Sequence, residues 1–238
     1  MKIRADLHTH SIGSGHAYST IDEMALAAKQ RGLKILAITD HAPNMPGGAH
    51  EYFFYNLRAL PEYLHGVRLL RGAEVNIISQ NGALDLEPEM LAALDVVVAS
   101  AHAVTTPENL TKKQNTEMYL KVIANQHVDI LGHIENPIFA LDYEAVIAAA
   151  QEHGKLVEIN NASFGLARHG SYNNCLEIMR ILKERNMPVV INSDAHVATR
   201  VGEVSRAMEV ALVQGIKPEN ILNLNAKKTA EWLKIKLK

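Results

Sequence analysis

The sequence has little of what marks a secreted, membrane-spanning or nucleic-acid-binding protein. Its one cysteine, Cys175, cannot form an internal disulfide, which favours a reducing, cytoplasmic environment. Aromatic residues make up only 5% of the chain, and a formal net charge of −2 argues against a broad basic surface for nucleic acid or anionic lipid. No apolar run approaches the roughly 20 residues of a transmembrane helix. Residues 1–6 lack the apolar core of a signal peptide, so we expect no secretion signal.

The remaining composition is that of an ordinary globular protein. Hydrophobic residues account for 47% and charged residues for 21% of the 238 residues, which excludes disorder, fibres and low complexity. The sequence contains no Pro/Gly/Ser-rich linker, no block of like charge and no close internal repeat. It therefore predicts one domain over residues 1–238. The unusual feature of the composition is its 12 histidines, and their positions along the chain indicate a function.

Seven short apolar runs alternate with helical patterns along the chain. A capping box at Thr20–Glu23 opens the first predicted helix and Gly32 closes it, while Asp142 opens another that ends at Gly154. Further helices are predicted near 174–185, 203–214 and 226–237. The predicted strands are Lys2–Leu7, Lys34–Thr39, Val67–Ala73, Asp95–Ser100, Asp129–Gly132, Lys155–Ile159 and Pro188–Asn192. This alternation predicts an α/β fold with a parallel sheet.

Candidate metal ligands stand at the ends of six of the seven predicted strands. In chain order they are His8 and His10, Asp40 and His41, Glu74, His102, His133, and Asp194 and His196. The sixth strand ends in Glu158-Ile159-Asn160-Asn161, without an obvious ligand. In a closed parallel barrel all these ends lie on one face, where active sites of such barrels form. The distribution therefore favours a barrel over an open, doubly wound sheet.

The spacing of these residues suits shared metal ions. Residues i and i+2 of an extended strand point the same way, with α-carbons about 6.5 Å apart. His8 with His10, and Asp194 with His196, can therefore converge on one ion or on adjacent ions. His16 follows the first strand closely enough to fold back over the same face. Imidazole and carboxylate are ligands that zinc-like ions favour.

Each histidine taken alone has an ordinary structural explanation. A single histidine after a strand is usually a solvated loop residue, and His65, His127 and His153 represent that background. Agreement among six strand ends is much harder to explain in this way. The pattern as a whole therefore predicts a metal site.

These segments resemble the polymerase-and-histidinol-phosphatase (PHP) superfamily over nearly the whole chain. The resemblance is carried by His8-Thr9-His10, Thr39-Asp40-His41, Gly72-Ala73-Glu74, His102, His133 and Ser193-Asp194-Ala195-His196. Residues 15–20 and 158–161 are similar to the stand-alone, YcdX-like phosphatases of that superfamily. The resemblance implies a distorted seven-stranded (β/α)7, TIM-like barrel with a metal site at the C-terminal face of its strands. It also implies three divalent ions, with zinc ahead of manganese or iron, and a homotrimer.

The resemblance further implies which residues bind the ions and what they do. One ion would be held by His8, His10 and Asp194, a second by His16, His41 and His196, and a third by His102 and His133, with Glu74 bridging the first and third. The charges of three divalent ions and two carboxylates sum to about +4, so the site is expected to bind anions. This charge predicts hydrolysis of a small phosphomonoester by a metal-bound hydroxide at a trinuclear centre, with catalytic roles for Glu74 and Asp194. Arg168 is predicted as a further catalytic residue from its position after the sixth strand.

Several further residues are weaker candidates, each with a structural alternative. Asp6 and Asp40 precede histidines of the set and could either orient them or cap loops. Arg168, next to His169, could fork onto a phosphate or be a solvated loop cation. His50 lies in a long loop and could close over a substrate.

Other functions stay open at this point. The protein could be a dedicated histidinol-phosphatase, or a phosphodiesterase or nuclease acting on nucleotides. Metal-dependent amidohydrolases share the opening His-x-His, but they commonly place a carboxylated lysine at a strand end, and no predicted strand here ends in lysine. A non-catalytic metal-binding module would not need so full a ligand set. The expected partner is therefore a small anionic phosphoester, not nucleic acid or a membrane.

Overall fold

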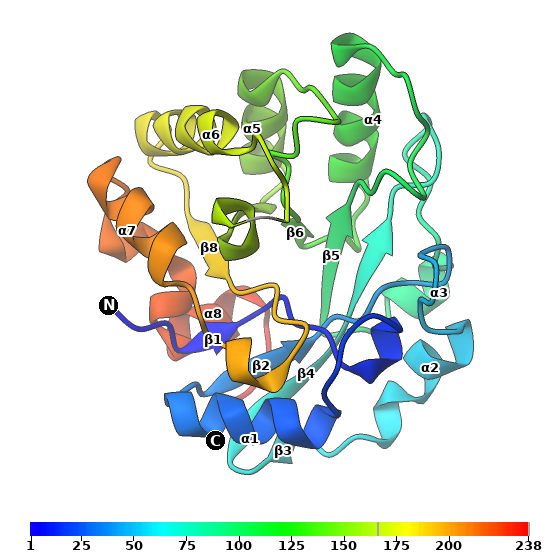
Figure 1. The fold of residues 1–238 in the computed structure, drawn as a ribbon, viewed down its shortest axis with the longest axis vertical. Coiled ribbons are helices and arrows are strands. Elements are labelled where there is room, and N and C mark those ends of the chain that lie inside the picture. Colours follow the sequence, from blue (N-terminus) through cyan, green and yellow to red (C-terminus); the bar gives the residue numbers. More distant parts are fainter. Residues whose placement is uncertain (166, 238) are drawn as a thin grey trace.

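Seven parallel strands form a nearly closed barrel in the computed structural model, which describes residues 1–165 and 167–237 (Figure 1). In hydrogen-bonding order they are β1 (Ala5–Asp6), β2 (Ile35–Ile38), β4 (Val67–Asn76), β5 (Val96–Ser100), β6 (Ile130–Leu131), β7 (Leu156–Asn160) and β8 (Val189–Asn192). A parallel bridge between Thr9 and Ala195 joins the segments that follow β1 and β8, and the His10 amide donates to the Ala195 carbonyl at 2.8 Å. The predicted seven-stranded α/β barrel is confirmed.

The strand ends differ from the predicted ones in one place that matters for the site. Strand β4 continues to Asn76, three residues beyond its predicted end, so Glu74 lies within the strand and pairs in register with Val98 of β5. A short strand that was not predicted, β3 (Tyr63–Leu64), pairs antiparallel with the start of β4. Glu74 is therefore carried by regular, doubly paired backbone rather than by a loop.

Helices cover the outside of the barrel (Figure 1). They are α1 (Ile21–Arg31), α2 (Glu51–Asn56), α3 (Pro88–Leu91), α4 (Lys112–Ala124), α5 (Tyr143–Glu152), α6 (Tyr172–Glu184), α7 (Ser205–Val213) and α8 (Ala226–Trp232). The predicted capping box of α1 is present. Helix α8 is shorter than predicted and ends at Trp232, because Lys234 adopts a positive φ of 56° that a helix cannot contain. Helix α4 was not predicted, although Thr111 and Gln114 form a second capping box. No helix among the described residues is long and apolar enough to span a bilayer.

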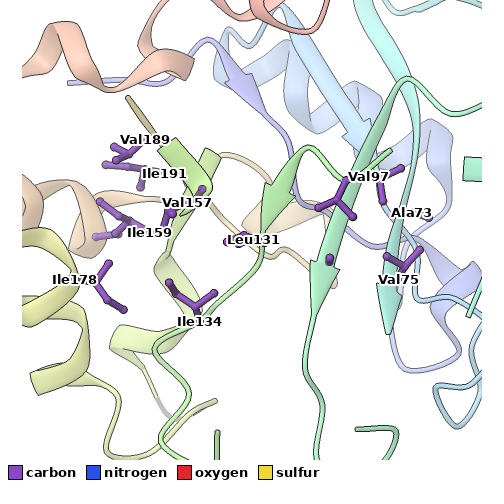
Figure 2. Packing of buried hydrophobic residues seen from close by; sticks show 14 of the residues in the cluster. Ala73, Val75, Val97, Leu131, Ile134, Val157, Ile159, Ile178, Val189 and Ile191 are labelled. Atoms are coloured by element: carbon purple, nitrogen blue, oxygen red, sulfur yellow. The ribbon is translucent and has the colours of Figure 1, made fainter. Parts of the chain in front are cut away.

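Two apolar cores hold these layers together. The larger lies between strands and helices and includes Val97, Leu131 and Ile159 (Figure 2). The smaller fills the N-terminal half of the barrel, where buried strand residues meet the partly buried Trp232 of α8. The expected packing of Trp232 onto the barrel is therefore observed.

The barrel interior changes from apolar to polar along the strands. On β7, Leu156 belongs to the inner core, whereas Glu158 and Asn160, two and four residues later, are buried polar groups. Because alternate residues of a strand share one face, all three project from the same face of β7. On β4 the same alternation separates Leu70 from Glu74. The fold therefore places a buried polar cluster at the C-terminal ends of the strands.

Candidate metal centre

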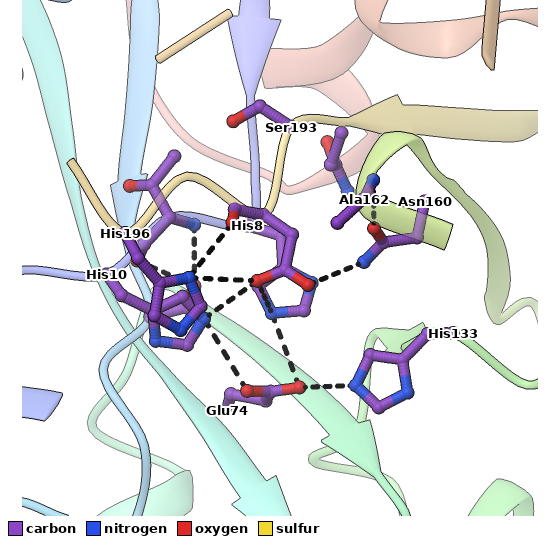
Figure 3. Close-up of polar contacts among 12 residues, drawn as sticks. His8, His10, Glu74, His133, Asn160, Ala162, Ser193 and His196 are labelled. Atoms are coloured by element: carbon purple, nitrogen blue, oxygen red, sulfur yellow. Dashed lines mark hydrogen bonds and ion pairs between the residues drawn. The ribbon is translucent and has the colours of Figure 1, made fainter. Parts of the chain in front are cut away.

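The Glu74 carboxylate lies close to nitrogen atoms of five imidazole rings. Figure 3 shows three of these rings, His8, His10 and His133, around it. Its Oε1 lies 2.9 Å from His133 Nε2, 3.3 Å from His8 Nε2 and 3.4 Å from His102 Nε2, and its Oε2 lies 2.7 Å from His41 Nδ1 and 3.5 Å from His10 Nε2. The carboxylate is fully buried. One side chain of β4 thus connects ligand candidates from four other strand ends.

Three groups of side chains are close enough to hold an ion each, with ligand atoms within 4.8 Å of one another. They are His8, His10 and Asp194; His10, His41 and His196; and His41, Glu74 and His102. The Asp194 Oδ1 atom lies 3.3 Å from His10 Nε2 and 3.7 Å from His8 Nε2. His10 and His41 each belong to two groups, so the groups are contiguous.

The structure brings all nine predicted ligand residues to one place. The first group has the membership that the resemblance implied, while the other two contain His10 and His41 where the resemblance placed His16 and His133. His16 is exposed at the mouth, with its ring centroid 4.9 Å from that of His41 and 5.0 Å from that of His196. His133 touches Glu74 from the opposite side.

The buried donor atoms of the centre fit metal ions. Five of them have no hydrogen-bond partner among the described residues: His8 Nε2, His10 Nε2, His41 Nδ1, His133 Nδ1 and Glu74 Oε2. A buried polar atom without a partner costs about 1–3 kcal/mol, so several in one cluster call for a ligand that satisfies them. Imidazole nitrogens and carboxylate oxygens are the donors that zinc-like ions prefer. Within the described part of the chain, these residues could therefore hold several divalent ions.

Glu158 is a functional candidate that the sequence analysis did not identify. Its Oε1 lies 2.8 Å from His8 Nδ1 and accepts from Asn192 Nδ2 at 2.9 Å. Its Oε2 accepts from the His133 amide and from Asn160 Nδ2, both at 3.0 Å. The fully buried carboxylate therefore fixes the His8 ring so that Nε2 faces Glu74. A charged residue inside the apolar run of β7 was the signal available in the sequence.

Other buried groups orient the remaining rings. Ser14 Oγ lies 3.0 Å from His10 Nδ1 and donates to Asp40 Oδ1 at 2.6 Å. Asp40 therefore acts on His10 through Ser14, not directly on the ring of His41. His102 Nδ1 lies 2.8 Å from Asn76 Oδ1. These contacts leave the Nε2 atoms of His10 and His102 directed toward Glu74.

Asp6 binds the backbone next to Asp194 instead of orienting the His8 ring. Its carboxylate accepts from the hydroxyl and the amide of Ser193 and from the amide of Gly202. Burial raises its pKa to about 6, against the lowering effect of these hydrogen bonds. Asp6 thus holds the backbone next to Asp194.

The charges of the cluster are strongly coupled. Burial would lower the pKa of His8, but the carboxylates of Glu158, Glu74 and Asp194 outweigh it and raise that pKa well above its usual value. Burial lowers the pKa of His133 to about 4 and, with the neighbouring His41, holds the pKa of His10 well below its usual value. His10 and His133 are therefore neutral, ligand-ready imidazoles at neutral pH.

Two candidate ligands stand on strained backbone. Asp194 has a φ of 55° and His133 a φ of 30°, in the left-handed region that non-glycine residues rarely adopt. Such conformations cost about 1–3 kcal/mol each and persist where the surrounding structure imposes them, commonly at functional sites.

The loop that carries His16 crosses close to the backbone of Gly47, where a β-carbon on Gly15 would overlap it. Only glycine at position 15 lets the loop that carries His16 lie this close.

Arg168 reaches the edge of the metal centre. Its guanidinium donates to Asp194 Oδ2 at 2.9 Å and to Ser163 Oγ at 3.0 Å, and the side chain is only 13% exposed. It is therefore not a solvated loop cation. The neighbouring carboxylate of Asp194 raises its pKa despite burial.

An open cavity of about 360 Å³ leads to these residues. Its walls include His16, His102, Asp194, His196 and Arg168. Two other sequence candidates lie elsewhere: His169 is exposed and does not line this cavity, and His50 caps helix α2 by accepting from the Tyr52 amide. The cavity has room for a small molecule held between the ion ligands and a buried arginine.

Residues 6–169 match the PHP domain family. The chain belongs to this family. Of the nine predicted ligand residues, seven lie within the match, and Asp194 and His196 lie beyond it.

Relatives of this PHP-domain protein cover nearly its whole length. It is 45% identical over 236 residues to a probable phosphatase of Thermoanaerobacter sp. (strain X514), covering 99% of this chain and 96% of that protein. It is 43% identical to a probable phosphatase of Acetivibrio thermocellus, with coverage of 99% and 97%. Its fold is similar to that of the histidinol phosphate phosphatase of Lactococcus lactis, determined with zinc, L-histidinol and phosphate. That likeness has a TM-score of 0.64 at 17% identity and covers 90% and 94% of the two chains.

Proposed function

We propose that this PHP-domain protein is a metal-dependent phosphatase that hydrolyses small phosphomonoesters. The observation that carries the proposal is the buried cluster around Glu74, in which several donor atoms lack a hydrogen-bond partner and which lies next to the mostly buried Arg168 in an open cavity. The names of the two relatives at 45% and 43% identity support the same reaction class. We further propose that residues 1–238 act as one hydrolase domain in the cytoplasm. The assembly into a homotrimer remains a prediction from the family resemblance.

The nine residues predicted from the sequence would hold the ions: His8, His10, His16, His41, Glu74, His102, His133, Asp194 and His196. We propose three ions, and zinc because imidazole nitrogens outnumber carboxylate oxygens in the set. Bound divalent ions supply positive charge for the phosphoryl oxygens and lower the pKa of water to about 7. Glu74 and Asp194 partly neutralise the ions, and Glu158 keeps His8 in its ligand orientation.

The proposal is tested by a panel of phosphoesters assayed on one preparation whose metal content is also measured. The panel includes histidinol phosphate, sugar phosphates, nucleoside monophosphates and a phosphodiester. We expect about three ions per chain, turnover of phosphomonoesters, and loss of turnover after chelation. Preferential turnover of the phosphodiester would favour a nuclease instead. One ion or none with full activity would contradict the proposed centre.

Replacing Arg168 is expected to weaken phosphate binding more than turnover. If the guanidinium grips non-reacting phosphoryl oxygens, it binds ground state and transition state alike, so Arg168→Ala raises KM and the inhibition constant of inorganic phosphate. Losing a charge-assisted hydrogen bond corresponds to about a ten- to hundred-fold fall in kcat/KM. Steady-state kinetics with phosphate inhibition measure both effects.

Two comparisons make this test specific. Arg168→Lys should recover only part of the loss, because a point charge cannot reproduce the planar fork of arginine. Metal content is measured on the same preparations, because Arg168 also donates to Asp194 and a loss of metal would have to be separated from a loss of phosphate binding. Wild-type KM and phosphate inhibition in Arg168→Ala would mean that the ions hold the phosphate without this residue.

Acidification is expected to reduce activity between about pH 5 and 7. The metal-bound protein carries fewer protons than the metal-free protein, so lowering the pH favours the metal-free form. His8, whose pKa is raised, must lose a proton when metal binds, whereas His10 and His133 are already neutral. Calorimetry in buffers of different ionisation enthalpy should detect release of at least about one proton per chain at pH 7. A flat rate profile down to pH 4 would contradict a histidine-held centre.

A further inference from the structure

A second cavity lies directly beside the metal centre. Its volume is about 440 Å³, and Ala162, Asp194 and His196 form part of its wall as well as part of the wall of the first cavity. Two of these residues, Ala162 and His196, are labelled in Figure 3. The two cavities therefore adjoin along these three residues.

The wall of this second cavity also includes two arginines, Arg200 and Arg206. Arg200 ends the short helix η4 (Ala198–Arg200), and Arg206 is in the first turn of α7. Both side chains are exposed, and neither guanidinium has a hydrogen bond or ion pair among the residues that the structure describes. Two cations thus line one hollow without a protein partner.

The nearby acidic groups are already occupied. The Glu203 carboxylate, which also lines the cavity, accepts from Arg31 Nη1 at 3.2 Å and from the Ser205 hydroxyl. Asp194 is paired with Arg168 at 2.9 Å. The opposite charges within each of these ion pairs cancel. Arg200 and Arg206 therefore contribute an uncompensated positive charge of about +2 to the cavity.

The two arginines are carried by well-anchored backbone. The Ala207 amide donates to Asn161 Oδ1 at 3.0 Å, which ties the start of α7 to the helix η3 (Asn161–Phe164) that follows β7. The η4 turn is held by the Ala198 amide, which donates to Ser19 Oγ at 3.0 Å. Their positions relative to the metal centre are therefore set by the barrel.

We propose that this cavity is a subsite for a second anionic group of the substrate, bound by Arg200 and Arg206 while a phosphomonoester occupies the metal centre. The inference rests on the proposed phosphatase function and narrows its substrate class to small molecules with two anionic groups. Guanidinium forks bind phosphate and carboxylate alike, so either group fits the subsite. Arg200 and Arg206 would then determine specificity without taking part in phosphoryl transfer.

The test varies the distance between the two anionic groups of the substrate. Straight chains of three to six carbons that carry a phosphate at one end are compared with a hydroxyl, a second phosphate or a carboxylate at the other end. For one chain length, the metal-loaded wild-type protein should show a kcat/KM at least about ten-fold higher with the second anion than without it. Arg200→Ala and Arg206→Ala should each reduce that preference about three- to ten-fold, a modest effect because both side chains are exposed. The double variant should abolish it.

Matched controls separate this effect from general damage. Turnover of the monophosphates should stay within about two-fold in all three variants, because the subsite touches only the second anion. Arg180→Ala removes another exposed arginine, which pairs with Glu144 and Glu184 on the surface of helix α6, and should leave both substrate classes unaffected. The preferred terminal group, phosphate or carboxylate, identifies the chemistry of the second anion.

Direct binding distinguishes failure of this inference from failure of the proposed function. Alkane bisphosphonates and monophosphonates of the same lengths cannot be hydrolysed, so calorimetry with them needs no catalytic activity. Tighter binding of the bisphosphonate, lost in the double variant, supports the subsite even if no phosphoester is turned over. Equal binding of both probes by the wild type, or equal losses for both probes in the variants, overturns it.

Discussion

Glu74→Ala is expected to lower kcat/KM by more than about a thousand-fold and to strip the protein of most of its metal. Replacing a group that merely orients a ligand costs about 10–100-fold in metal affinity or activity, and Glu74 lies within 3.5 Å of five candidate ligand nitrogens. Removing this carboxylate deprives the surrounding imidazoles of the negative charge that all of them contact. Metal analysis and steady-state kinetics on the same preparation measure the effect.

His133→Ala is the matched comparison for this prediction. It removes one terminal imidazole that contacts Glu74 at 2.9 Å and leaves the other four in place. We expect it to retain more metal and more activity than Glu74→Ala, because in the proposed centre Glu74 would serve two ions and His133 only one. Indistinguishable metal content and rates in the two variants would contradict the bridging role of Glu74.

Glu158→Ala is expected to lower both metal affinity and the stability of the metal-free protein. The substitution deprives His8, Asn160, Asn192 and the His133 amide of their buried acceptor. Breaking such a network costs about 3–5 kcal/mol, which corresponds to a fall in Tm of about 10 °C for a chain of this size. Loss of the group that orients His8 should reduce metal affinity about 100-fold. Thermal unfolding of chelated protein and zinc titration measure the two effects separately.

Glu158→Gln keeps the volume of the side chain and tests the charge. A glutamine amide nitrogen cannot accept a hydrogen bond, so at least one pair of donors would face each other in this site. We therefore expect an intermediate loss of stability and a clear loss of metal affinity. Wild-type metal affinity in Glu158→Gln would show that His8 does not depend on this carboxylate for its orientation.

The sequence by itself determined the architecture and the set of candidate ligands. Alternation of short apolar runs with helical patterns predicted the seven parallel strands, and the positions of His8, His10 and Glu74 relative to those runs placed them on one face. This works because hydrophobic periodicity is a local property, and because parallel strands of one barrel all end on the same side.

Only the tertiary structure decided how those side chains meet. Glu158 binds His8 across 150 positions of sequence, and its role depends on which strands lie opposite each other in the closed barrel. The pairing of Arg168 with Asp194, and the cavity that Arg200 and Arg206 line together with Ala162, likewise join segments whose distance the chain order does not reveal. Strand patterns report which face a side chain takes, whereas ring orientation, burial and hydrogen-bond partners arise when the barrel closes and brings its first and last strands together.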